Sequence, residues 1–313
     1  MLRKILITGG AGNLGSSLAI RLIQDPNNFV YIVDDLSTGN VMKLPSSTYD
    51  NWAFKKVDVN CFEEIQAVME SGQFDFVFHY AAVVGVARTL EHPVKVLDDI
   101  DGIKNILDLS VKTGVKRIFY SSSSEVYGEP VELPLHEETS PLNSKLPYAI
   151  VKNVGEAYCR SYFLEYSLSY TIFRFFNTYG PRQSLDFVMT KFIEQAQKGA
   201  DITIHGSGLQ TRTFCYIDDN LDTIEAILND GHCVNDTINI GSADEITILE
   251  LARRIIKLTG SASKIVHLPA LELGDMTRRK PDITKMLAIL DKEMIGLDEG
   301  ILKTIEMGVE QNI

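Results

Sequence analysis

Tyr148 and Lys152 stand four residues apart in PYAIVKNVGEAYCRSYF (147–163), a stretch whose apolar spacing predicts a helix. Residues at positions i and i+4 share one face of a helix, so a phenol and an ammonium ion are expected side by side. A tyrosine with an ordinary pKa of about 10 is a poor base at neutral pH, and lowering that pKa to about 7 requires roughly 4 kcal/mol. A neighbouring cation can supply such a shift. The pair predicts a tyrosine that acts as a general base, although alone the spacing also fits two unrelated surface residues.

Four consecutive serines follow a stretch that is expected to be a buried strand. The run SSSSE (121–125) comes directly after VKRIFY, whose apolar and aromatic residues are typical of a core strand. Parallel sheets bind their ligands at the carboxyl ends of the strands. The hydroxyls and the carboxylate of residues 121–125 are therefore expected at a ligand-binding edge.

A glycine-rich turn lies close to the N-terminus. Gly9, Gly12 and Gly15 follow the apolar run KILIT and open a helical pattern, a spacing that lets backbone N–H groups approach a pyrophosphate at a helix N-terminus. Asp34 ends the next apolar run, where a carboxylate would bind the adenosine ribose hydroxyls and repel the 2′-phosphate of NADP. Together these residues predict a dinucleotide site that prefers NAD.

These groups require a sheet that places them at one edge. Apolar runs at residues 4–8, 29–34, 74–80, 117–122 and 170–176 are predicted strands, and residues 13–24, 61–71, 103–114 and 147–163 are predicted helices. Strands that alternate with helices imply right-handed crossovers and a parallel sheet covered on both faces. The predicted fold is α/β, a Rossmann-type doubly wound parallel sheet with a smaller, partly interleaved C-terminal substrate-binding region.

Composition narrows the possible partners and the compartment. The chain has 30 Lys and Arg against 42 Asp and Glu, a formal net charge of −12, which argues against general binding to nucleic acid or to an anionic membrane. The 4 cysteines show no close pairing and the 6 histidines no metal-ligand spacing, so we expect free thiols and no metal site. With no signal-peptide core and no apolar run of membrane length, a cytoplasmic location is expected.

The combined motifs resemble the extended short-chain dehydrogenase/reductase family, specifically its NAD-dependent nucleotide-sugar epimerases and dehydratases. Beyond TGGAGNLG and the Ser/Tyr/Lys set, the similarity includes VDDLSTG, FRFFNTYGPR, TRTFCYIDD, INIGSADEITILELA and GDMTRRKPDITK. The resemblance implies an enzyme that binds NAD and oxidises a nucleotide-diphosphate sugar at C4. We expect the NAD-binding domain over residues 1–176 and 212–242, and the nucleotide-sugar-binding region over residues 177–211 and 243–313.

The resemblance also implies roles for individual residues. Tyr148 would take the proton from the sugar 4-hydroxyl, Lys152 would tune Tyr148 and bind the ribose, and Ser123 would hold the same sugar oxygen, with Glu125 as a further catalytic candidate. Other cofactor contacts are expected from Gly9, Gly12, Asn13, Leu14, Gly15, Asp34, Asp35, Leu36, Ser37, Thr38, Asp58, Val59, Tyr80, Ala81, Ala82, Asp99, Ser121 and Phe176. Substrate contacts are expected from Ser123, Ser124, Glu125, Asn177, Arg212 and Arg279, the last three at the diphosphate.

Several outcomes of the oxidation at C4 remain open. The interval between Ser123 and Tyr148 resembles that of the UDP-glucose 4-epimerases, which makes a nucleotide-sugar 4-epimerase the leading interpretation. Glu125 and Arg279 are similar to residues of the UDP-glucuronate decarboxylases, and a decarboxylase-like enzyme is the alternative. Ser124 replaces an acidic residue of the dTDP-glucose 4,6-dehydratases, which disfavours dehydration.

Two departures from the family pattern leave further readings open. Asp99 stands where the family usually has Asn beside the cofactor, and Glu272 replaces an arginine. Glu272 argues against a standard epimerase, whereas Asp99 and the incomplete set of dehydratase residues allow a nucleotide-sugar 4-dehydrogenase that releases the 4-keto sugar. A non-enzymatic NAD sensor or scaffold is disfavoured because Ser123, Tyr148 and Lys152 are all present. Members of the family commonly dimerise through the helix that carries Tyr148 and Lys152 and through the helix before it. The resemblance therefore implies a homodimer or a higher homo-oligomer.

Overall fold

The computed structural model describes residues 2–84, 89, 91–270 and 278–308, which divide into two compact units. Unit 1 comprises Met1–Val126, Ser144–Arg174 and Glu225–Ile238, and unit 2 comprises Tyr127–Asn143, Phe175–Ile224 and Asn239–Ile313. The chain therefore passes between the units several times, and the predicted interleaving of a second region is confirmed.

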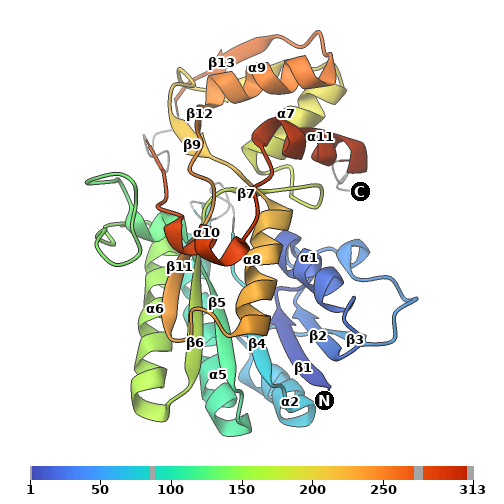
Figure 1. The fold of residues 1–313 in the computed structure, drawn as a ribbon, viewed down its shortest axis with the longest axis vertical. Helices are drawn as coiled ribbons and strands as arrows, with labels where there is room; N and C mark the ends of the chain where they lie inside the picture. Colours follow the sequence, from blue (N-terminus) through green and yellow to red (C-terminus); the bar gives the residue numbers. More distant parts are fainter. Residues whose placement is uncertain (1, 85–88, 90, 271–277, 309–313) are drawn as a thin grey trace. The chain divides into compact units, whose positions relative to one another are not determined.

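Unit 1 is built around the parallel sheet that the alternating pattern predicted. Within the described residues a seven-stranded sheet has the order β11-β6-β5-β4-β1-β2-β3, and its strands are labelled across Figure 1 in that order. The strands are β1 Arg3–Thr8, β2 Asn28–Asp34, β3 Trp52–Lys56, β4 Phe76–His79, β5 Arg117–Ser123, β6 Ser169–Phe175 and β11 Asp236–Ile240. The pairs β3–β2, β2–β1, β1–β4 and β4–β5 are parallel. The Rossmann-type α/β fold is therefore confirmed.

The predicted strands and helices are confirmed with shifted ends, but β3 was missed. Its sequence WAFKK has two exposed lysines and three half-buried residues, so it lacks the apolar run by which the other strands were recognised. It lies at one edge of the sheet, where polar side chains are tolerated. Trp52 on this strand donates its indole N–H to the backbone oxygen of Ser46 at 3.1 Å.

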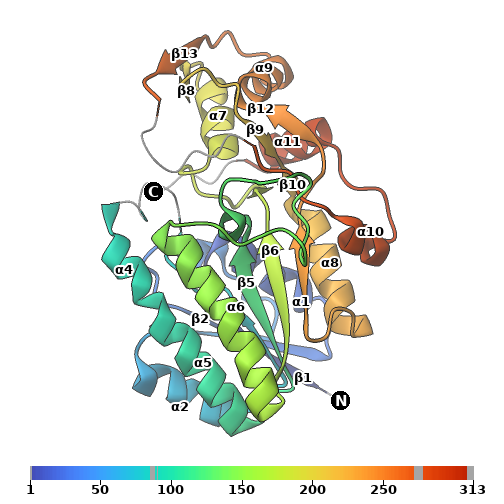
Figure 2. The same ribbon diagram turned by 90° about the vertical axis from the view of Figure 1, so that its left-hand side faces the viewer.

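Helices cover both faces of the sheet, because the strand order reverses at β1. The crossover from β1 to β2 runs opposite to those that lead to β4, β5 and β6, so right-handed connections place α1 on the face opposite α2, α5 and α6. Figure 2 shows α2, α5 and α6 side by side on one face. The helices are α1 Asn13–Leu22, α2 Phe62–Gly72, α4 Pro93–Leu97, α5 Asp99–Thr113, α6 Pro147–Tyr166 and α8 Ile217–Asp230.

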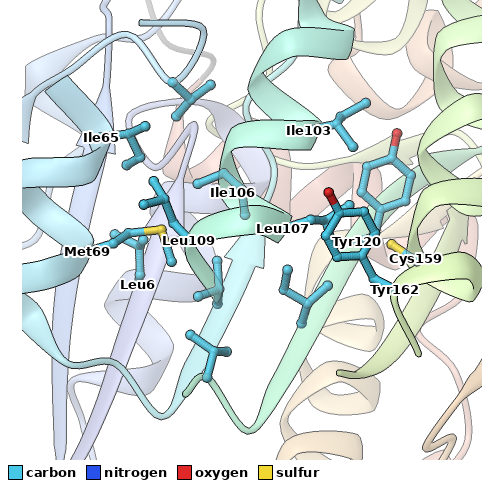
Figure 3. Packing of buried hydrophobic residues seen from close by; sticks show 14 of the residues in the cluster. Leu6, Ile65, Met69, Ile103, Ile106, Leu107, Leu109, Tyr120, Cys159 and Tyr162 are labelled. Carbon is cyan, nitrogen blue, oxygen red and sulfur yellow. The ribbon is translucent and has the colours of Figure 1, made fainter. Parts of the chain in front are cut away.

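The core of unit 1 lies between the sheet and the layer of α2, α5 and α6. Figure 3 shows part of this cluster: Leu6, Ile65, Met69, Ile103, Ile106, Leu107, Leu109, Tyr120, Cys159 and Tyr162. Tyr120 of β5 is 1% exposed and points its ring toward α6, where Gly155 leaves room for it. A Cβ at Gly155 would lie 2.1 Å from the Tyr120 hydroxyl oxygen, so α6 approaches β5 closely because position 155 has no side chain.

Unit 2 consists of short strands and amphipathic helices. Its strands pair as β10 with β7, β12 with β9 and β13 with β8. The elements are η2 Ser124–Tyr127, which crosses the unit boundary, β7 Thr178–Tyr179, α7 Val188–Gln197, β8 Ile202–His205, β9 Thr211–Thr213, β10 Cys215–Tyr216, β12 Glu245–Thr247, α9 Ile248–Thr259, β13 Ile265–Leu268, α10 Thr284–Leu290 and α11 Leu297–Met307. Helix α9 packs against both α7 and α11.

The described residues contain no membrane-spanning helix, no cluster of metal ligands and no disulfide bond. In these ranges no helix is long and apolar enough to cross a membrane. The same ranges hold no group of three or more His, Cys, Asp or Glu side chains placed to bind a metal ion. The cysteines, all four of which lie in described segments, form no disulfide bond with one another.

Replacing Gly155 by alanine tests the close approach of α6 to β5. We expect Gly155→Ala to lower the free energy of unfolding by about 1–3 kcal/mol, because the new methyl group overpacks the Tyr120 hydroxyl. Tyr120→Phe alone should be neutral or slightly stabilising, since no hydrogen-bond partner of this hydroxyl is found among the described residues. Urea unfolding of the two single variants and the double variant checks this. Because the methyl group would also lie 2.2 Å from Cζ of the Tyr120 ring, which phenylalanine keeps, the double variant should regain only part of the loss. A Gly155→Ala variant as stable as the wild type would contradict the contact.

Candidate active site

Helix α6 places Tyr148 and Lys152 together, as their spacing predicted. The helix begins at Pro147, which suits the first helical position because its missing N–H needs no partner there. Tyr148 is half-buried, and Lys152 is only 3% exposed. The Lys152 Nζ lies 5.7 Å from the centroid of the Tyr148 ring and 5.3 Å from that of Tyr120. The ammonium group therefore lies near two aromatic rings, and one of them is the predicted base.

Burial makes the charge on Lys152 easy to lose. Removal from water lowers the pKa of its ammonium group to about 8, and the field of the Asp99 carboxylate opposes that decrease. A buried cation next to a phenol favours the ionised form of the phenol. The arrangement can therefore support a tyrosine base near neutral pH.

The serine run divides between a structural hydroxyl and a candidate catalytic one. Strand β5 continues through Ser123, which is half-buried like Ser121 and accepts the backbone N–H of Glu125 at 3.2 Å. Ser122 and Ser124 are each 2% exposed, and Ser122 donates its hydroxyl to Glu156 at 2.6 Å. Glu125 is half-buried. The catalytic roles of Ser123 and Glu125 and the substrate contact of Ser124 stay predictions.

Glu156, which sequence reasoning missed, ties α6 to the sheet. Its Oε1 accepts the Ser122 hydroxyl and the Arg174 Nε at 2.8 Å, and its Oε2 accepts an Arg174 terminal nitrogen at 2.7 Å and one from Arg160 at 2.9 Å. Burial would raise the pKa of Glu156, but the hydrogen bonds and charge of Arg174 lower it below its ordinary value. The signal in the sequence is its spacing, because Glu156 follows Lys152 by four residues on the same helix face.

The glycine turn between β1 and α1 has the geometry of a phosphate loop. Gly9 has φ +66°, and a Cβ there would lie 2.6 Å from the backbone nitrogen of Ala81. A Cβ at Gly15 would lie 2.5 Å from the Gly9 oxygen. Gly12 caps the helix, and a Cβ there would lie 3.2 Å from the Gly9 oxygen. Asn13 and Leu14 begin α1 in half-buried positions. The turn thus presents backbone N–H groups at the start of a ten-residue helix.

Asp34 organises the loop after β2. Its carboxylate accepts the backbone N–H of Ala11 at 3.0 Å and that of Leu36 at 2.8 Å. Burial raises the pKa of Asp34, against the effect of these two hydrogen bonds. Leu36 has φ +61°, and Asp35 accepts the N–H of Ser37 at 2.9 Å. Asp35, Ser37 and Thr38 are exposed. Through these two hydrogen bonds Asp34 connects the loop after β2 with the glycine turn. Its binding to the ribose stays a prediction.

The loop after β3 is also fixed by hydrogen bonds. Asp58 is half-buried and accepts the N–H of Asn60 at 2.9 Å, while Val59 is buried and its oxygen accepts from Asn105 at 3.0 Å. The Oδ1 atoms of Asn60 and Asn13 are buried and have no partner in the described parts of the chain. A buried acceptor ordinarily has a hydrogen-bond donor. A dinucleotide that donates a hydrogen bond to Asn13 in the glycine turn and to Asn60 in the loop after β3 therefore fits the two segments.

The end of β4 meets the glycine turn through Thr8. The Thr8 hydroxyl accepts the N–H groups of Tyr80 and Ala81, each at 3.2 Å, and lies 2.9 Å from Nδ1 of His79. Tyr80, Ala81 and Ala82 are half-buried. Asp99 is 9% exposed at the start of α5 and accepts the N–H of Val83 at 2.8 Å. Most of the predicted cofactor residues of unit 1 therefore lie at or just after strand ends or at helix starts, whereas Ser121 lies within β5 and Lys152 within α6.

The remaining predicted residues belong to unit 2. Phe176 is 1% exposed, and Asn177 is half-buried and donates its side-chain amide to the Thr213 oxygen at 2.9 Å. Arg212 and Arg279 are 9% and 5% exposed, so both guanidinium groups are withdrawn from bulk water. The neighbouring Arg278 instead forms an exposed two-point ion pair with Glu245. Glu272 lies outside the described residues.

Comparison with known proteins decides the family. A family model described as "NAD dependent epimerase/dehydratase family" matches residues 5–241. The chain belongs to this family. It is 36% identical to the UDP-N-acetyl-alpha-D-glucosaminuronate decarboxylase of Bacillus cytotoxicus, over 98% of this chain and 98% of that protein. The predicted family is confirmed, and with it the prediction of an enzyme that uses NAD.

Solved structures of the family have the same fold. The UDP-glucose 4-epimerase of Thermotoga maritima, solved with UDP-glucose, superimposes with a TM-score of 0.91 at 32% identity, over 97% of this chain and 98% of that one. The UDP-glucose 4-epimerase of Thermus thermophilus, solved in complex with NAD, gives a TM-score of 0.89 at 27% identity, over 97% and 98% of the two chains. The glycine turn and the two unpartnered asparagine oxygens in unit 1 fit the NAD of this family.

The ion pair of Glu156 with Arg174 predicts a large loss of stability when the charge is removed. Glu156→Gln should lower the free energy of unfolding by about 3–5 kcal/mol, because Arg174 would keep a buried and uncompensated charge. The matched control is Glu165→Gln on the same helix, whose side chain is exposed and which should change stability by less than about 0.5 kcal/mol. Guanidinium chloride unfolding at neutral pH measures both variants.

The same ion pair predicts a pH dependence. Since the pKa of Glu156 is lower in the folded protein than its ordinary value of 4.5, its contribution is fully present above pH 4.5 and is lost as the pH falls through the folded-state pKa. Below pH 4.5 the stability of the wild type should therefore fall more steeply than that of Glu156→Gln. Parallel stability curves for the two proteins would contradict a charged Glu156.

Proposed function

We propose that the chain binds NAD and oxidises a nucleotide-diphosphate sugar at C4, with Tyr148 as the base. The observation that carries this proposal is the buried Lys152 ammonium group, which lies 5.7 Å from the Tyr148 ring on a helix packed against β5. Two unrelated surface residues with the same spacing would be solvated, and Lys152 is only 3% exposed. This burial supports a functional pair rather than an accidental one.

Each residue of the proposed site has its own role in the oxidation at C4. Tyr148 accepts the proton of the sugar 4-hydroxyl, and Lys152 stabilises the phenolate that this requires. Ser123, at the end of β5, holds the same sugar oxygen by hydrogen bonding. Bound NAD supplies the acceptor for the hydride that leaves C4. In unit 2, Asn177 and the withdrawn guanidinium groups of Arg212 and Arg279 are proposed to hold the diphosphate.

We place 4-epimerisation first among the possible outcomes. In that reaction the 4-keto sugar turns over and is reduced on its other face, so the oxidised cofactor is restored without a further reactant. Two observations support it: the interval between Ser123 and Tyr148, and the similarity to the UDP-glucose 4-epimerases of Thermotoga maritima and Thermus thermophilus. The proposed division stays as predicted, with residues 1–176 and 212–242 for NAD and residues 177–211 and 243–313 for the nucleotide sugar, in a cytoplasmic homodimer or higher homo-oligomer.

Decarboxylation is the second candidate, because a specific residue favours it. A sugar that carries a carboxylate at C6 becomes a β-keto acid when C4 is oxidised, and it can then lose CO₂ and leave a carbanion at C5. Glu125, half-buried two residues beyond Ser123, is proposed to return a proton to that carbon. The Bacillus cytotoxicus relative is named for this type of reaction.

Tyr148→Phe tests the proposed base. We expect kcat to fall by about 10²–10⁴-fold, because the phenylalanine cannot accept the 4-hydroxyl proton, while the dissociation constant for NAD⁺ stays within about twofold. Tyr166→Phe is the matched control, since Tyr166 lies on the same helix and is 51% exposed. Full activity of Tyr148→Phe would refute the assignment.

The outcome of the reaction is tested with four substrates: UDP-glucose, UDP-N-acetylglucosamine and the uronic acids of both. Epimerisation predicts a product of unchanged mass with an inverted C4 signal in the NMR spectrum. Decarboxylation predicts CO₂ release from the uronic acids only. Accumulation of bound NADH with a released 4-keto sugar would indicate the 4-dehydrogenase instead.

A further inference from the structure

Glu245, on β12, joins two segments of unit 2 that lie far apart in the sequence. Its Oε1 accepts the Thr211 hydroxyl at 3.0 Å and the Arg278 Nε at 3.1 Å, and its Oε2 accepts an Arg278 terminal nitrogen at 2.7 Å. Thr211 directly precedes Arg212, and Arg278 directly precedes Arg279. One carboxylate therefore binds the immediate neighbours of both arginines that are proposed to hold the diphosphate.

The pairing of β12 with β9 places Glu245 and Arg212 on opposite faces. In this antiparallel pair Ile246 lies opposite Arg212, and Thr247 lies opposite Thr211 (Figure 1). Because successive side chains of a strand point to opposite faces, Glu245 shares a face with Thr211, and Arg212 points from the other face. The Arg212 guanidinium group donates to the Thr211 backbone oxygen at 2.8 Å. Glu245 therefore contacts β9 on the face opposite the guanidinium group.

The segment that carries Arg279 is held on both sides of this residue. On its C-terminal side the Lys280 oxygen accepts the backbone N–H of Leu135 at 2.8 Å. On its N-terminal side the Glu245 carboxylate binds Arg278 at two points. Arg278 is exposed, whereas Arg279 is only 5% exposed, so the ion pair lies at the surface and the neighbouring guanidinium group is withdrawn from it. Loss of the ion pair would remove one of these two attachments of the segment.

The geometry of the Glu245 contacts suits a positioning role. Exposed ion pairs ordinarily contribute little to stability, but a two-point contact between arginine and a carboxylate fixes the orientation of both groups. The Arg278 side chain is 54% exposed, whereas that of Glu245 is 18% exposed and has a third hydrogen bond, from Thr211. The hydrogen bonds of Arg278 hold the pKa of Glu245 below its ordinary value, so the carboxylate is ionised at neutral pH.

We propose that Glu245 is a positioning residue for the diphosphate of the substrate, which it serves by holding the segments of Arg212 and Arg279 at a fixed spacing. This proposal rests on the proposed function in taking these two arginines as the diphosphate ligands. Two guanidinium groups can bind one diphosphate only when their spacing matches that of its phosphate groups. Glu245 does this through Thr211 and Arg278, its hydrogen-bond partners.

The sign of the expected effect separates positioning from simple electrostatics. Glu245 is an anion, so its field alone would repel a diphosphate, and removal of its charge would then strengthen the binding of the diphosphate. If Glu245 instead holds the two arginine segments, removal of its charge loosens them and weakens the binding. The two explanations therefore predict opposite changes in the same dissociation constant.

Calorimetry with UDP measures this change directly. In the full chain saturated with NAD⁺, Glu245→Gln should raise the dissociation constant of UDP about 5- to 30-fold, while that of NAD⁺, measured separately, stays within about twofold. Glu250→Gln is the matched control, because Glu250 forms an ion pair with Arg254 at 3.4 Å on α9 and should leave UDP binding within about twofold. Unchanged or tighter UDP binding by Glu245→Gln would overturn the proposal.

Arg278→Gln tests whether Glu245 acts through Arg278. Its effect on UDP binding should resemble that of Glu245→Gln, and the double variant should bind UDP within about twofold of the weaker single variant, because both changes break the same contact. Losses that multiply in the double variant would overturn the proposal. So would weaker binding in Arg278→Gln alone, which would make Arg278 itself a diphosphate ligand.

Steady-state kinetics gives a second reading with whichever nucleotide sugar turns over. Glu245→Gln should raise KM by a factor comparable with the change in UDP affinity and affect kcat less, because the diphosphate is bound alike in the ground state and the transition state. A reduced kcat at unchanged KM would contradict a role in diphosphate binding.

Hydrogen exchange of the backbone amides needs no ligand. Mass spectrometry of peptides that span residues 209–214 and 278–284 should show exchange at least about threefold faster in Glu245→Gln than in the wild type, and unchanged exchange in Glu250→Gln. Equal exchange in Glu245→Gln and the wild type would overturn the proposal. If the wild type does not bind UDP, the proposed function fails, and the exchange rates still decide whether Glu245 holds the two segments.

Discussion

The buried carboxylate of Glu156 holds α6 in register with β5 and β6, and the candidate catalytic groups depend on that register. Four donors from three elements converge on it: the Ser122 hydroxyl, two nitrogens of Arg174 and one of Arg160. A carboxylate can be tolerated in the interior only when it is paired and hydrogen-bonded in this way. Because Ser122 precedes Ser123 and Glu156 lies two helical turns beyond Tyr148, one anchor fixes the strand end and the helix face together.

Lys152, one turn away from Glu156, is in the opposite situation. The charge of Glu156 is matched by a guanidinium group at hydrogen-bond distance, whereas the ammonium ion of Lys152 lies near two aromatic rings, and only the field of the Asp99 carboxylate opposes the loss of its charge. The first charge is held firmly, and its lowered pKa reflects stabilisation. The second is only partly compensated, and its pKa falls to about 8. A single helix face thus carries a structural charge and a responsive one, and the responsive one lies beside the phenol.

Much of this organisation was predictable from the sequence, and the exceptions have physical reasons. Central strands are recognisable because they are buried on both faces, and the helix with Tyr148 and Lys152 because their spacing is local. Strand β3 was missed because an edge strand can expose its lysines. Glu156 was missed because its partners Ser122 and Arg174 come from other elements, and only folding brings them together. Strands of two to four residues in unit 2 are too short to show a period. The state of Asp99 likewise depends on burial, which the sequence does not show.

The edge strand β3 also carries an intrinsic fluorescent probe, Trp52. Trp52 is the only tryptophan of the 313 residues, and it lies half-buried in unit 1 with its indole bonded to Ser46. Its emission therefore reports the environment of the sheet edge in unit 1. Fluorescence selectively excited in tryptophan follows the melting of one unit, while circular dichroism averages over both. A difference between the two transition curves would give the cooperativity of the units without any added probe.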